Sequence, residues 1–342
     1  MHKKALITGI TGQDGAYLAQ LLLEKQYIVY GAYRRSSKTN FWRIQTLGIN
    51  QHPRLHLVEF DITDMSSILW LLKQIQPDEV YNLAAQSLVS SSFSQPIAST
   101  NVNALGPLNF LESKRIVNPN IRFYQASTSE MFGNTPIQPQ SETTPFNPCS
   151  PYGAAKLYAH VLTDSYRKGY NLFACSGILF NHESPLRGHE FVTRKITSSL
   201  AKIRSGKLDY FELGNIDSKR DWGYAKEYVR GIWLMLQTDE PQDFVLAKNR
   251  AESVRYFIQI AAEAAEIPLK FENSGVNEIA INEKTQQVIL KINPEFYRPA
   301  DVNYLIGNPE KARKLLGWKS EISLEHLCQM MVENDIYINS EL

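Results

Sequence analysis

The sequence predicts an α/β protein with a doubly wound parallel sheet and a smaller C-terminal α/β lobe. Two observations carry this prediction. Short apolar runs alternate with helix-length segments through the first 180 residues, and a strand can return parallel to its neighbour only through such a crossover. The run NHESPLRG, which contains proline and glycine, then breaks the alternation. We therefore expect the sheet domain over 1–180, with returning segments at about 210–250, and mainly the second lobe over 181–342.

Each predicted element follows from its hydrophobic spacing. Runs rich in β-branched and aromatic residues predict strands, and apolar residues on one side, such as Leu157, Val161 and Leu162, predict helices. The predicted strands lie at 4–8, 27–33, 54–61, 78–85, 121–127 and 171–179. The predicted helices lie at 15–25, 66–75, 103–116 and 154–168. In the second lobe we expect a short strand within 281–292 and a short helix within 308–318.

The composition is that of an ordinary globular protein, with 43% hydrophobic and 21% charged residues among 342. The net charge of +1 gives no electrostatic basis for binding nucleic acid or a membrane surface. The first residues do not form a signal peptide, and no apolar run approaches the roughly 20 residues that span a bilayer. Cys149, Cys175 and Cys328 are far apart and lack metal-ligand spacing. We expect a cytoplasmic protein with reduced thiols and no metal, nucleic-acid or membrane partner.

A glycine-rich loop follows the first predicted strand and opens the first predicted helix. Its sequence, TGITGQDG, contains Gly9, Gly12 and Gly15. Glycines let the backbone approach a pyrophosphate, and the helix N-terminus supplies free N–H donors. This context predicts a Rossmann-type dinucleotide site, the alternative being a turn without a ligand. The loop residues expected at the cofactor are Gly9, Thr11, Gly12, Gln13 and Asp14.

The end of the second predicted strand indicates which dinucleotide binds. An NAD enzyme usually places an acid there to hold the ribose 2′-hydroxyl, whereas this chain has Arg34, Arg35 and Ser36. Guanidinium and hydroxyl groups suit a 2′-phosphate. The sequence therefore predicts NADP over NAD, the alternative being a solvated basic turn.

Two later strand ends are expected to complete the cofactor site. Asp61 and Ile62 follow the third strand, where a carboxylate and an apolar side chain suit adenine. Leu83, Ala85 and Ser87 belong to LAAQS, whose small side chains leave room for a dinucleotide against the backbone.

Tyr152 and Lys156 are spaced i, i+4 and so face the same side of a predicted helix. An ammonium beside a phenol is expected to lower the pKa of the tyrosine, and such a pair can move a proton from a hydroxyl. The preceding strand ends in hydroxyl residues and an acid, including Thr128 and Glu130. A simple dehydrogenase does not need that second acid, which indicates that a second proton is moved.

These motifs resemble the GDP-mannose 4,6-dehydratase family of the extended short-chain dehydrogenase/reductase superfamily, over nearly the whole chain. The matching stretches are ALITGITGQDGAYLA, RRSS, QPDEVYNLAAQS, RFYQASTSEMFG, SPYGAAKLYA, GILFNHESPLRG, FVTRKIT, LGNIDSKRDWGYAKEYV and YRPADV. The stretches NHESPLRG and RDWG are the most specific, because they separate this family from dTDP-glucose and UDP-sugar relatives.

The resemblance implies conversion of GDP-D-mannose to GDP-4-keto-6-deoxy-D-mannose by C4 oxidation, loss of water across C5 and C6, and hydride return to C6. It assigns Tyr152, with Lys156, to the C4 hydroxyl proton, Glu130 to the C5 proton, and Thr128 to the region of the C4 hydroxyl. It places His182 and Arg187 beside the cofactor. The substrate contacts that it implies are Ser87, Asn181, Val192, Lys195, Arg220, Arg298 and Asp301. Arg220 and Arg298 would hold the diphosphate, and Asp301 the guanine or ribose.

Three departures from the family pattern leave alternatives open. The loop RRSSKTNFWRI differs from the family, so a homodimer and a homotetramer both remain expected. Ala98 stands where a tyrosine is usual. Gly153 replaces a common alanine, which costs up to about 1 kcal/mol of helix propensity. One alternative is a GDP-manno-heptose 4,6-dehydratase. A second is an NADP-dependent nucleotide-sugar reductase or epimerase, against which Glu130 argues, since a plain reductase needs no base at C5. A third is a silent dinucleotide-binding regulator, which needs neither Tyr152 nor Lys156.

Overall fold

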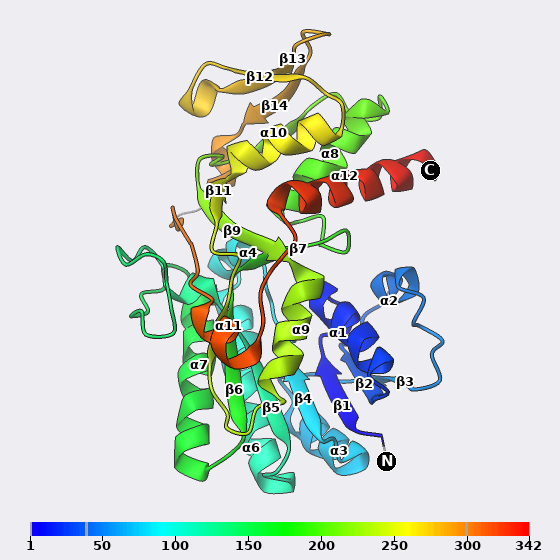
Figure 1. Cartoon of the computed structure of the whole chain (residues 1–342), viewed down its shortest axis with the longest axis vertical. Helices are drawn as coiled ribbons and strands as arrows, with labels where there is room; N and C mark the ends of the chain where they lie inside the picture. The colour runs from blue at the N-terminus through cyan, green and yellow to red at the C-terminus, as the bar shows by residue number, and fades with distance from the viewer. Residues whose placement is uncertain (1, 38–39, 298–299, 342) are drawn as a thin grey trace.

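The structure is a computed structural model that describes residues 2–37, 40–297 and 300–341. Figure 1 shows a domain built around a large sheet, with the N-terminus at its foot, and a second lobe that holds the C-terminal helix. A small sheet lies between the two parts. This arrangement leaves the upper edge of the large sheet facing the lobe.

Among the described residues, seven strands pair in parallel in the order β10-β6-β5-β4-β1-β2-β3. They are β1 (Lys4–Thr8), β2 (Ile28–Tyr33), β3 (Leu55–Glu59), β4 (Glu79–Asn82), β5 (Arg122–Thr128), β6 (Ala174–Leu179) and β10 (Phe244–Leu246). The order reverses between β1 and β4, which is the topological switch point where doubly wound sheets bind ligands. The predicted doubly wound parallel sheet is confirmed.

Helices cover both faces of this sheet. On one face, α1 (Gln13–Glu24) packs with α9 (Ala225–Met235), and α2 (Trp42–Thr46) and α11 (Glu310–Leu316) complete the layer. On the other face, α3 (Met65–Ile75) and α6 (Gly106–Val117) pack with α7 (Pro151–Tyr170). The predicted helices correspond to α1, α3, α6 and α7, and the helix predicted within 308–318 is α11.

The helix predicted over 103–116 is interrupted at its start. The short helices α4 (Val89–Ser94) and α5 (Pro96–Thr100) lead into a π-helical turn, η1 (Asn101–Leu105), before α6 begins. Pro107 lacks the N–H that would bond back into this turn, so the turn is wider than an α-helix. Gly106 lets α6 approach the segment that follows β3, since a Cβ there would lie 2.8 Å from Ile62 Cγ1.

The lobe is built on two smaller sheets. One has the order β11-β9-β7 and the other β12-β13-β14-β8. Their strands are β7 (Asn181–Glu183), β8 (Phe211–Leu213), β9 (Lys219–Tyr224), β11 (Ala251–Ser253), β12 (Leu269–Glu272), β13 (Ile279–Asn282) and β14 (Val288–Ile292). The helices are α8 (Val192–Arg204), α10 (Val254–Ala264) and α12 (Leu324–Glu341), with short 3₁₀ turns at Gly275–Asn277 and Pro294–Phe296. The short strand predicted within 281–292 is β14, and the end of its hairpin partner β13 lies in the same range.

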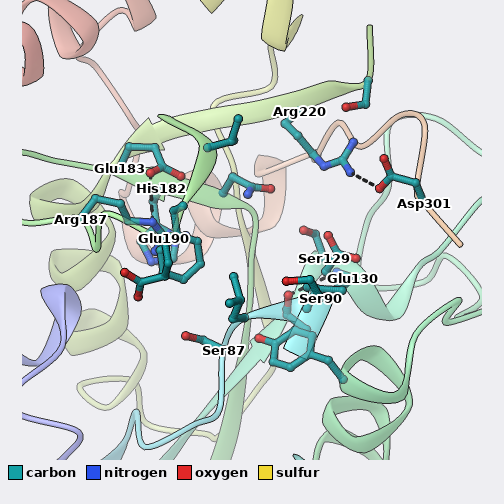
Figure 2. Close-up of a pocket in the computed structure, with 18 of the residues that line it drawn as sticks. Ser87, Ser90, Ser129, Glu130, His182, Glu183, Arg187, Glu190, Arg220 and Asp301 are labelled. Carbon is teal, nitrogen blue, oxygen red and sulfur yellow. Dashed lines mark hydrogen bonds and ion pairs between the residues drawn. The ribbon is translucent and has the colours of Figure 1, made fainter. Parts of the chain in front are cut away.

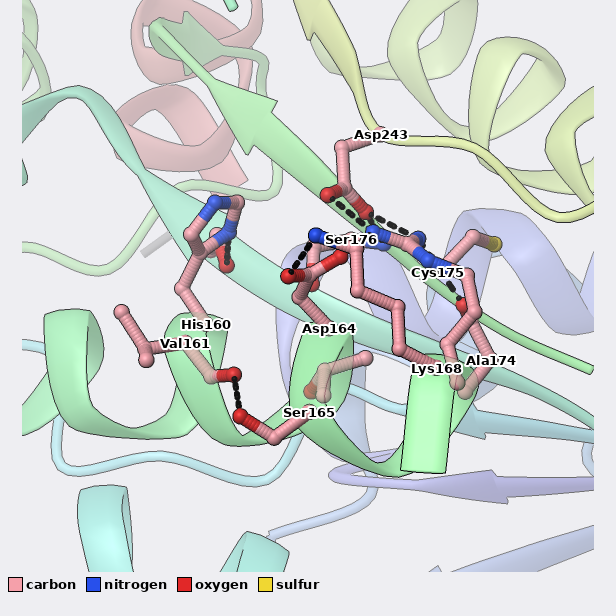
Figure 3. A network of polar contacts seen from close by, with 12 residues as sticks. His160, Val161, Asp164, Ser165, Lys168, Ala174, Cys175, Ser176 and Asp243 are labelled. Atoms are coloured by element: carbon pink, nitrogen blue, oxygen red, sulfur yellow. Dashed lines mark hydrogen bonds and ion pairs between the residues drawn. The ribbon is translucent and has the colours of Figure 1, made fainter. Parts of the chain in front are cut away.

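Arg167 fixes the returning edge strand β10 to the sheet domain. Its guanidinium donates to both carboxylate oxygens of Asp243, at 2.9 and 2.8 Å, and to the Ala174 carbonyl oxygen at 3.0 Å. Asp243 also accepts the Ser176 N–H at 2.7 Å, and Asp164 pairs with Arg167 at 2.6 Å (Figure 3). The polar network thus joins α7, β6 and the start of β10, just before the chain goes back to the lobe at β11.

Candidate active site

A cavity of about 770 Å³ lies at the carboxyl ends of the central strands, between the sheet domain and the lobe. Most of the predicted site residues line it: Asp14, Leu83, Ala85, Ser87, Thr128, Glu130, Tyr152, Lys156, Asn181, His182, Arg187, Val192, Lys195, Arg220 and Asp301. Figure 2 shows His182, Glu183 and Arg187 at one side of this cavity and Arg220 with Asp301 at another. The predicted residue Arg298 lies outside the described residues.

The glycine-rich loop has the geometry of a phosphate cradle. Gly9 has a φ of 73°, which side chains disfavour, and a Cβ on Gly15 would lie 2.3 Å from the Gly9 carbonyl oxygen. Gly12 is the N-cap of the 12-residue helix α1 and has no side chain to occupy its free N–H groups. This loop and helix end fit a pyrophosphate, because they combine close backbone approach with a positive dipole end.

Asp14 and His182 form an ion pair beside this loop. The His182 Nε2 lies 2.8 Å from the Asp14 carboxylate, and its Nδ1 lies 2.7 Å from the Phe180 carbonyl oxygen. Both partners only accept hydrogen bonds, so both ring nitrogens must carry protons. Burial opposes the charged ring, but Asp14 outweighs it and raises the pKa of His182. Burial likewise opposes the Asp14 charge, but His182 and Arg187 lower the pKa of Asp14.

Gln13 and Arg43 join the glycine-rich loop to the segment that follows β7. Gln13 Nε2 donates to the His182 carbonyl oxygen at 3.0 Å, and Ser184 donates to Gln13 Oε1 at 2.6 Å. Arg43, which is buried, donates to the carbonyl oxygens of Thr11 at 2.8 Å and Leu186 at 2.7 Å. Sequence reasoning missed Arg43. An arginine on a short amphipathic helix looks like a surface residue until its partners are known.

The remaining predicted cofactor residues lie at neighbouring strand ends and are not part of the cavity wall. Arg34, Arg35 and Ser36 follow β2 and are exposed. Asp61 follows β3, where its carboxylate accepts the N–H and hydroxyl of Thr63 at 2.9 and 2.7 Å. Ile62 is buried in the core next to α6.

Tyr152 and Lys156 face the end of β5 from α7. Lys156 Nζ donates to the Ala126 carbonyl oxygen at 3.0 Å and lies 5.8 Å from the centroid of the Tyr152 ring. Burial lowers the pKa of Lys156 to about 8. Burial also raises the pKa of Tyr152 above its ordinary value. The expectation that Lys156 lowers this pKa is wrong for the structure, because burial of the phenol dominates and the ammonium is directed to a carbonyl.

Thr128 and Glu130 lie next to this phenol at the tip of β5. The Thr128 hydroxyl is hydrogen-bonded to Tyr152, and the Glu130 charge acts on the same phenol. Thr128 Oγ1 also accepts the Glu130 N–H at 3.3 Å, which caps the 3₁₀ turn Ser129–Met131. A Cβ on Gly153 would lie 2.9 Å from the Glu130 carbonyl oxygen. Gly153 therefore lowers the helix propensity of α7, but its lack of a side chain lets α7 approach the turn that carries Glu130.

Buried hydrogen bonds position these strand ends. The Thr8 hydroxyl bonds to the Asn82 side chain at 2.7 Å, and Asn82 donates to Gln125 at 2.8 Å. On the π-helical turn, Asn103 accepts the Gln86 N–H at 3.1 Å and donates to the Gln86 carbonyl oxygen at 2.9 Å. Asn103 thus holds the loop that carries Ala85 and Ser87. Sequence reasoning also missed Asn103, because the π-helical turn that orients its side chain was not predicted.

The lobe contributes cations and an acid to the other end of the cavity. Arg220, buried on β9, donates to Asp301 at 3.2 Å. Asn181 on β7 and Val192 and Lys195 at the start of α8 also line this part. The structure therefore brings Arg220, which was expected to hold the diphosphate, together with Asp301 in the cavity wall.

The family model described as GDP-mannose 4,6 dehydratase matches residues 6–331. The chain belongs to this family. A GDP-mannose 4,6-dehydratase from Yersinia enterocolitica is 49% identical and aligns over 98% of this chain and 94% of its own length. A GDP-mannose 4,6-dehydratase from Sinorhizobium fredii is 48% identical and aligns over 98% of this chain and 97% of its own length.

The fold of this family member is also that of solved sugar-nucleotide enzymes. The crystal structure of DesIV, a dTDP-glucose 4,6-dehydratase from Streptomyces venezuelae with NAD and TYD bound, matches with a TM-score of 0.82. The alignment covers 99% of this chain and 98% of the DesIV chain. The sequence identity is 19%, so the match is evidence for the fold alone. None of the described helices is long and apolar enough to cross a membrane. In the described part of the chain, no three His, Cys, Asp or Glu side chains form a group that suits a metal ion.

Proposed function

We propose that this protein is a GDP-mannose 4,6-dehydratase that converts GDP-D-mannose to GDP-4-keto-6-deoxy-D-mannose. The relatives named for this activity support the proposal, since their alignments span nearly the whole chain. The observation that carries it is the carboxylate of Glu130 beside the Tyr152 phenol. A plain reductase needs no base at C5, so the acid favours elimination of water.

The glycine-rich loop, His182 and Arg187 would hold a nicotinamide dinucleotide, and Arg34, Arg35 and Ser36 would contact a 2′-phosphate. We therefore propose NADP as the cofactor. When bound, its oxidised nicotinamide supplies a hydride acceptor for the sugar C4 and a positive charge at that end of the cavity. Lys156 and Thr128 donate hydrogen bonds there and orient the reacting hydroxyl.

Three side chains carry the proton movements. Tyr152 accepts the C4 hydroxyl proton, which the nearby positive charge of the loaded site assists by lowering the pKa of Tyr152. The C4 ketone acidifies the C5 proton, and Glu130 removes it. Glu130 then protonates the departing C6 hydroxyl, so water leaves across C5 and C6. C5 is reprotonated once C6 has been reduced, so the sequence of steps would be redox-neutral overall.

The remaining proposed roles concern binding of the substrate. We propose that Arg220 and Arg298 hold the diphosphate, because paired guanidinium groups suit two negative groups. Asn181, Val192 and Lys195 would contact the nucleotide sugar, and Asp301 would exchange its bond to Arg220 for the guanine or ribose. Ser87 would contact both substrate and cofactor.

An exposed apolar surface supports a homodimer or homotetramer. Ile97, Leu105, Tyr158 and Val161 are 44–74% exposed on the adjoining segments α5, η1 and α7. Val161 was expected to be on the packed side of its helix. We propose that a second copy covers this surface, and that Val161→Arg shifts the assembly to a smaller species in sedimentation. The three unpaired cysteines support a cytoplasmic location.

The proposed function is tested by incubating GDP-mannose with enzyme and trace NADP but no reductant. A 4-keto-6-deoxy product is expected, while a reductase gives no product under these conditions. A parallel incubation with GDP-manno-heptose tests the alternative sugar. Turnover of the heptose alone would replace mannose in the proposal, and turnover of neither would refute the proposed function.

A further inference from the structure

The segment 301–307 runs alongside the start of β9. The Lys219 N–H donates to the Asn303 carbonyl oxygen at 2.9 Å, and the Leu305 N–H donates to the Lys219 carbonyl oxygen at 3.2 Å. A parallel bridge joins Lys219 to Tyr304 between these two bonds. The segment is therefore fixed to the strand that carries the cavity cation Arg220.

The same segment packs against the turn that carries Glu130. Met131 and Phe132 follow Glu130 and share one buried hydrophobic cluster with Val302 and Leu305. All four side chains are buried. Because a protein interior is close-packed and transmits displacements, a shift of the segment would also move the turn.

The side chain of Asn134 closes the contact between the turn and the segment. Its Nδ2 donates to the Asp301 carbonyl oxygen at 2.9 Å, and its Oδ1 accepts the Asn303 N–H at 3.0 Å. The preceding residue is fixed as well, since a Cβ on Gly133 would collide with the Asn147 carbonyl oxygen. Asn134 itself is exposed, so its side chain can be replaced without emptying the core.

We propose that Asn134 is a positioning residue that fixes Glu130 relative to the bound nucleotide sugar. The proposal rests on the proposed function, in which Arg220 and Asp301 meet the nucleotide end of the substrate and Glu130 takes the C5 proton. Asn134 bonds to both sides of the segment that carries Asp301, four residues after Glu130 in the chain. A substrate held at Asp301 thus meets a carboxylate on the same packed unit, and small errors in such placement slow a reaction strongly.

A double-mutant cycle with Glu130 tests this role. Asn134→Ala is expected to lower kcat for GDP-mannose roughly 5- to 50-fold, because two uncharged hydrogen bonds are lost. In the Glu130→Gln background the same substitution should change kcat by less than about twofold, because the carboxylate that it misplaces is already absent. A merely structural role would instead lower kcat by the same factor in both backgrounds.

The matched control removes a similar bond at the other end of β5. Asn118 Oδ1 accepts the Asn120 N–H at 3.0 Å shortly before β5 begins, and Asn118→Ala is expected to keep the wild-type kcat. The rate of C4 oxidation in a single turnover, followed by the absorbance of the reduced nicotinamide, should be unchanged in Asn134→Ala, because Glu130 acts after this step. A general loss of structure would slow C4 oxidation too.

The outcomes separate the positioning role from the proposed function. A wild-type kcat in well-folded Asn134→Ala protein, an equal loss in both backgrounds, or slowed C4 oxidation would overturn the role of Asn134 and leave the dehydratase proposal standing. A wild type that forms no 4-keto-6-deoxy product would overturn the proposed function, and the positioning role with it.

Discussion

The imidazole Nε2 of His182 lies 2.8 Å from the carboxylate of Asp14, beside the glycine-rich loop. Asp14 occupies the first turn of α1, where a bare carboxylate would repel a cofactor pyrophosphate. The protonated imidazole neutralises it. The pair therefore makes an acid in the GQDG sequence compatible with an anionic ligand.

This ion pair predicts a pH dependence of stability. The raised pKa of His182 means that its contribution is complete below the ordinary value of 6.5 and is lost as pH rises through the folded pKa. The lowered pKa of Asp14 means that its contribution is complete above 3.8 and is lost as pH falls through the folded pKa. The window of full stabilisation thus lies between these two ordinary values.

His182→Gln is expected to destabilise the protein by about 1.5–3 kcal/mol at pH 6, the range for hydrogen bonds to charged groups. The difference should be smaller at pH 9, because the contribution of the charged ring is lost as pH rises through the folded pKa of His182. Urea denaturation at both pH values measures it, with Asp14→Asn and the double variant completing the cycle. An equal loss at pH 6 and pH 9 would contradict the prediction, because it would mean that the protonation state of His182 does not change over this range.

Glu130→Gln is expected to keep cofactor affinity but to reduce dehydration by about 10²–10⁴-fold, the usual contribution of a general acid or base. The amide cannot take the C5 proton, although it fills the same space. Steady-state product formation from GDP-mannose measures the loss, with Glu263→Gln as a control carboxylate far from the cavity. Turnover near that of the wild type would remove Glu130 from the mechanism.

Arg34 and Arg35 predict that NADP binds at least about tenfold more tightly than NAD, a difference of about 1.4 kcal/mol. Titration of cofactor-stripped protein with each dinucleotide provides the comparison. Replacing both arginines with alanine should weaken NADP and leave NAD nearly unchanged. Equal affinities in the wild type would mean that the basic strand end is only a solvated turn.

Arg43→Met is expected to raise the dissociation constant of the dinucleotide, because Arg43 joins the Thr11 backbone in the glycine-rich loop to the Leu186 backbone in the segment after β7. Two hydrogen bonds from a charged donor are involved, so a weakening of at least about tenfold is expected. At saturating cofactor, kcat should approach that of the wild type. A drop in kcat that saturation does not restore would indicate a general loss of structure.

The sequence predicted the sheet because its strand runs and crossover helices are local patterns. It also placed Thr128, Glu130, Tyr152 and Lys156 in one cavity, since parallel strands end at the same edge. The pKa of Tyr152 was mispredicted because burial depends on the whole fold. Arg43 and Asn103 were missed because their partners lie far away in sequence or on a π-turn. The division of the chain at residue 180 stays a prediction, as do the roles assigned to the site residues.

The most direct test of the account follows the hydrogen at C4 of the sugar. The enzyme is incubated with GDP-mannose deuterated at C4 and trace NADP, and the product is analysed by NMR and mass spectrometry. The account predicts a 4-keto-6-deoxy sugar that carries the deuterium at C6, with product far exceeding the cofactor present. A product that keeps its C6 hydroxyl, or deuterium recovered in the cofactor rather than at C6, would contradict it.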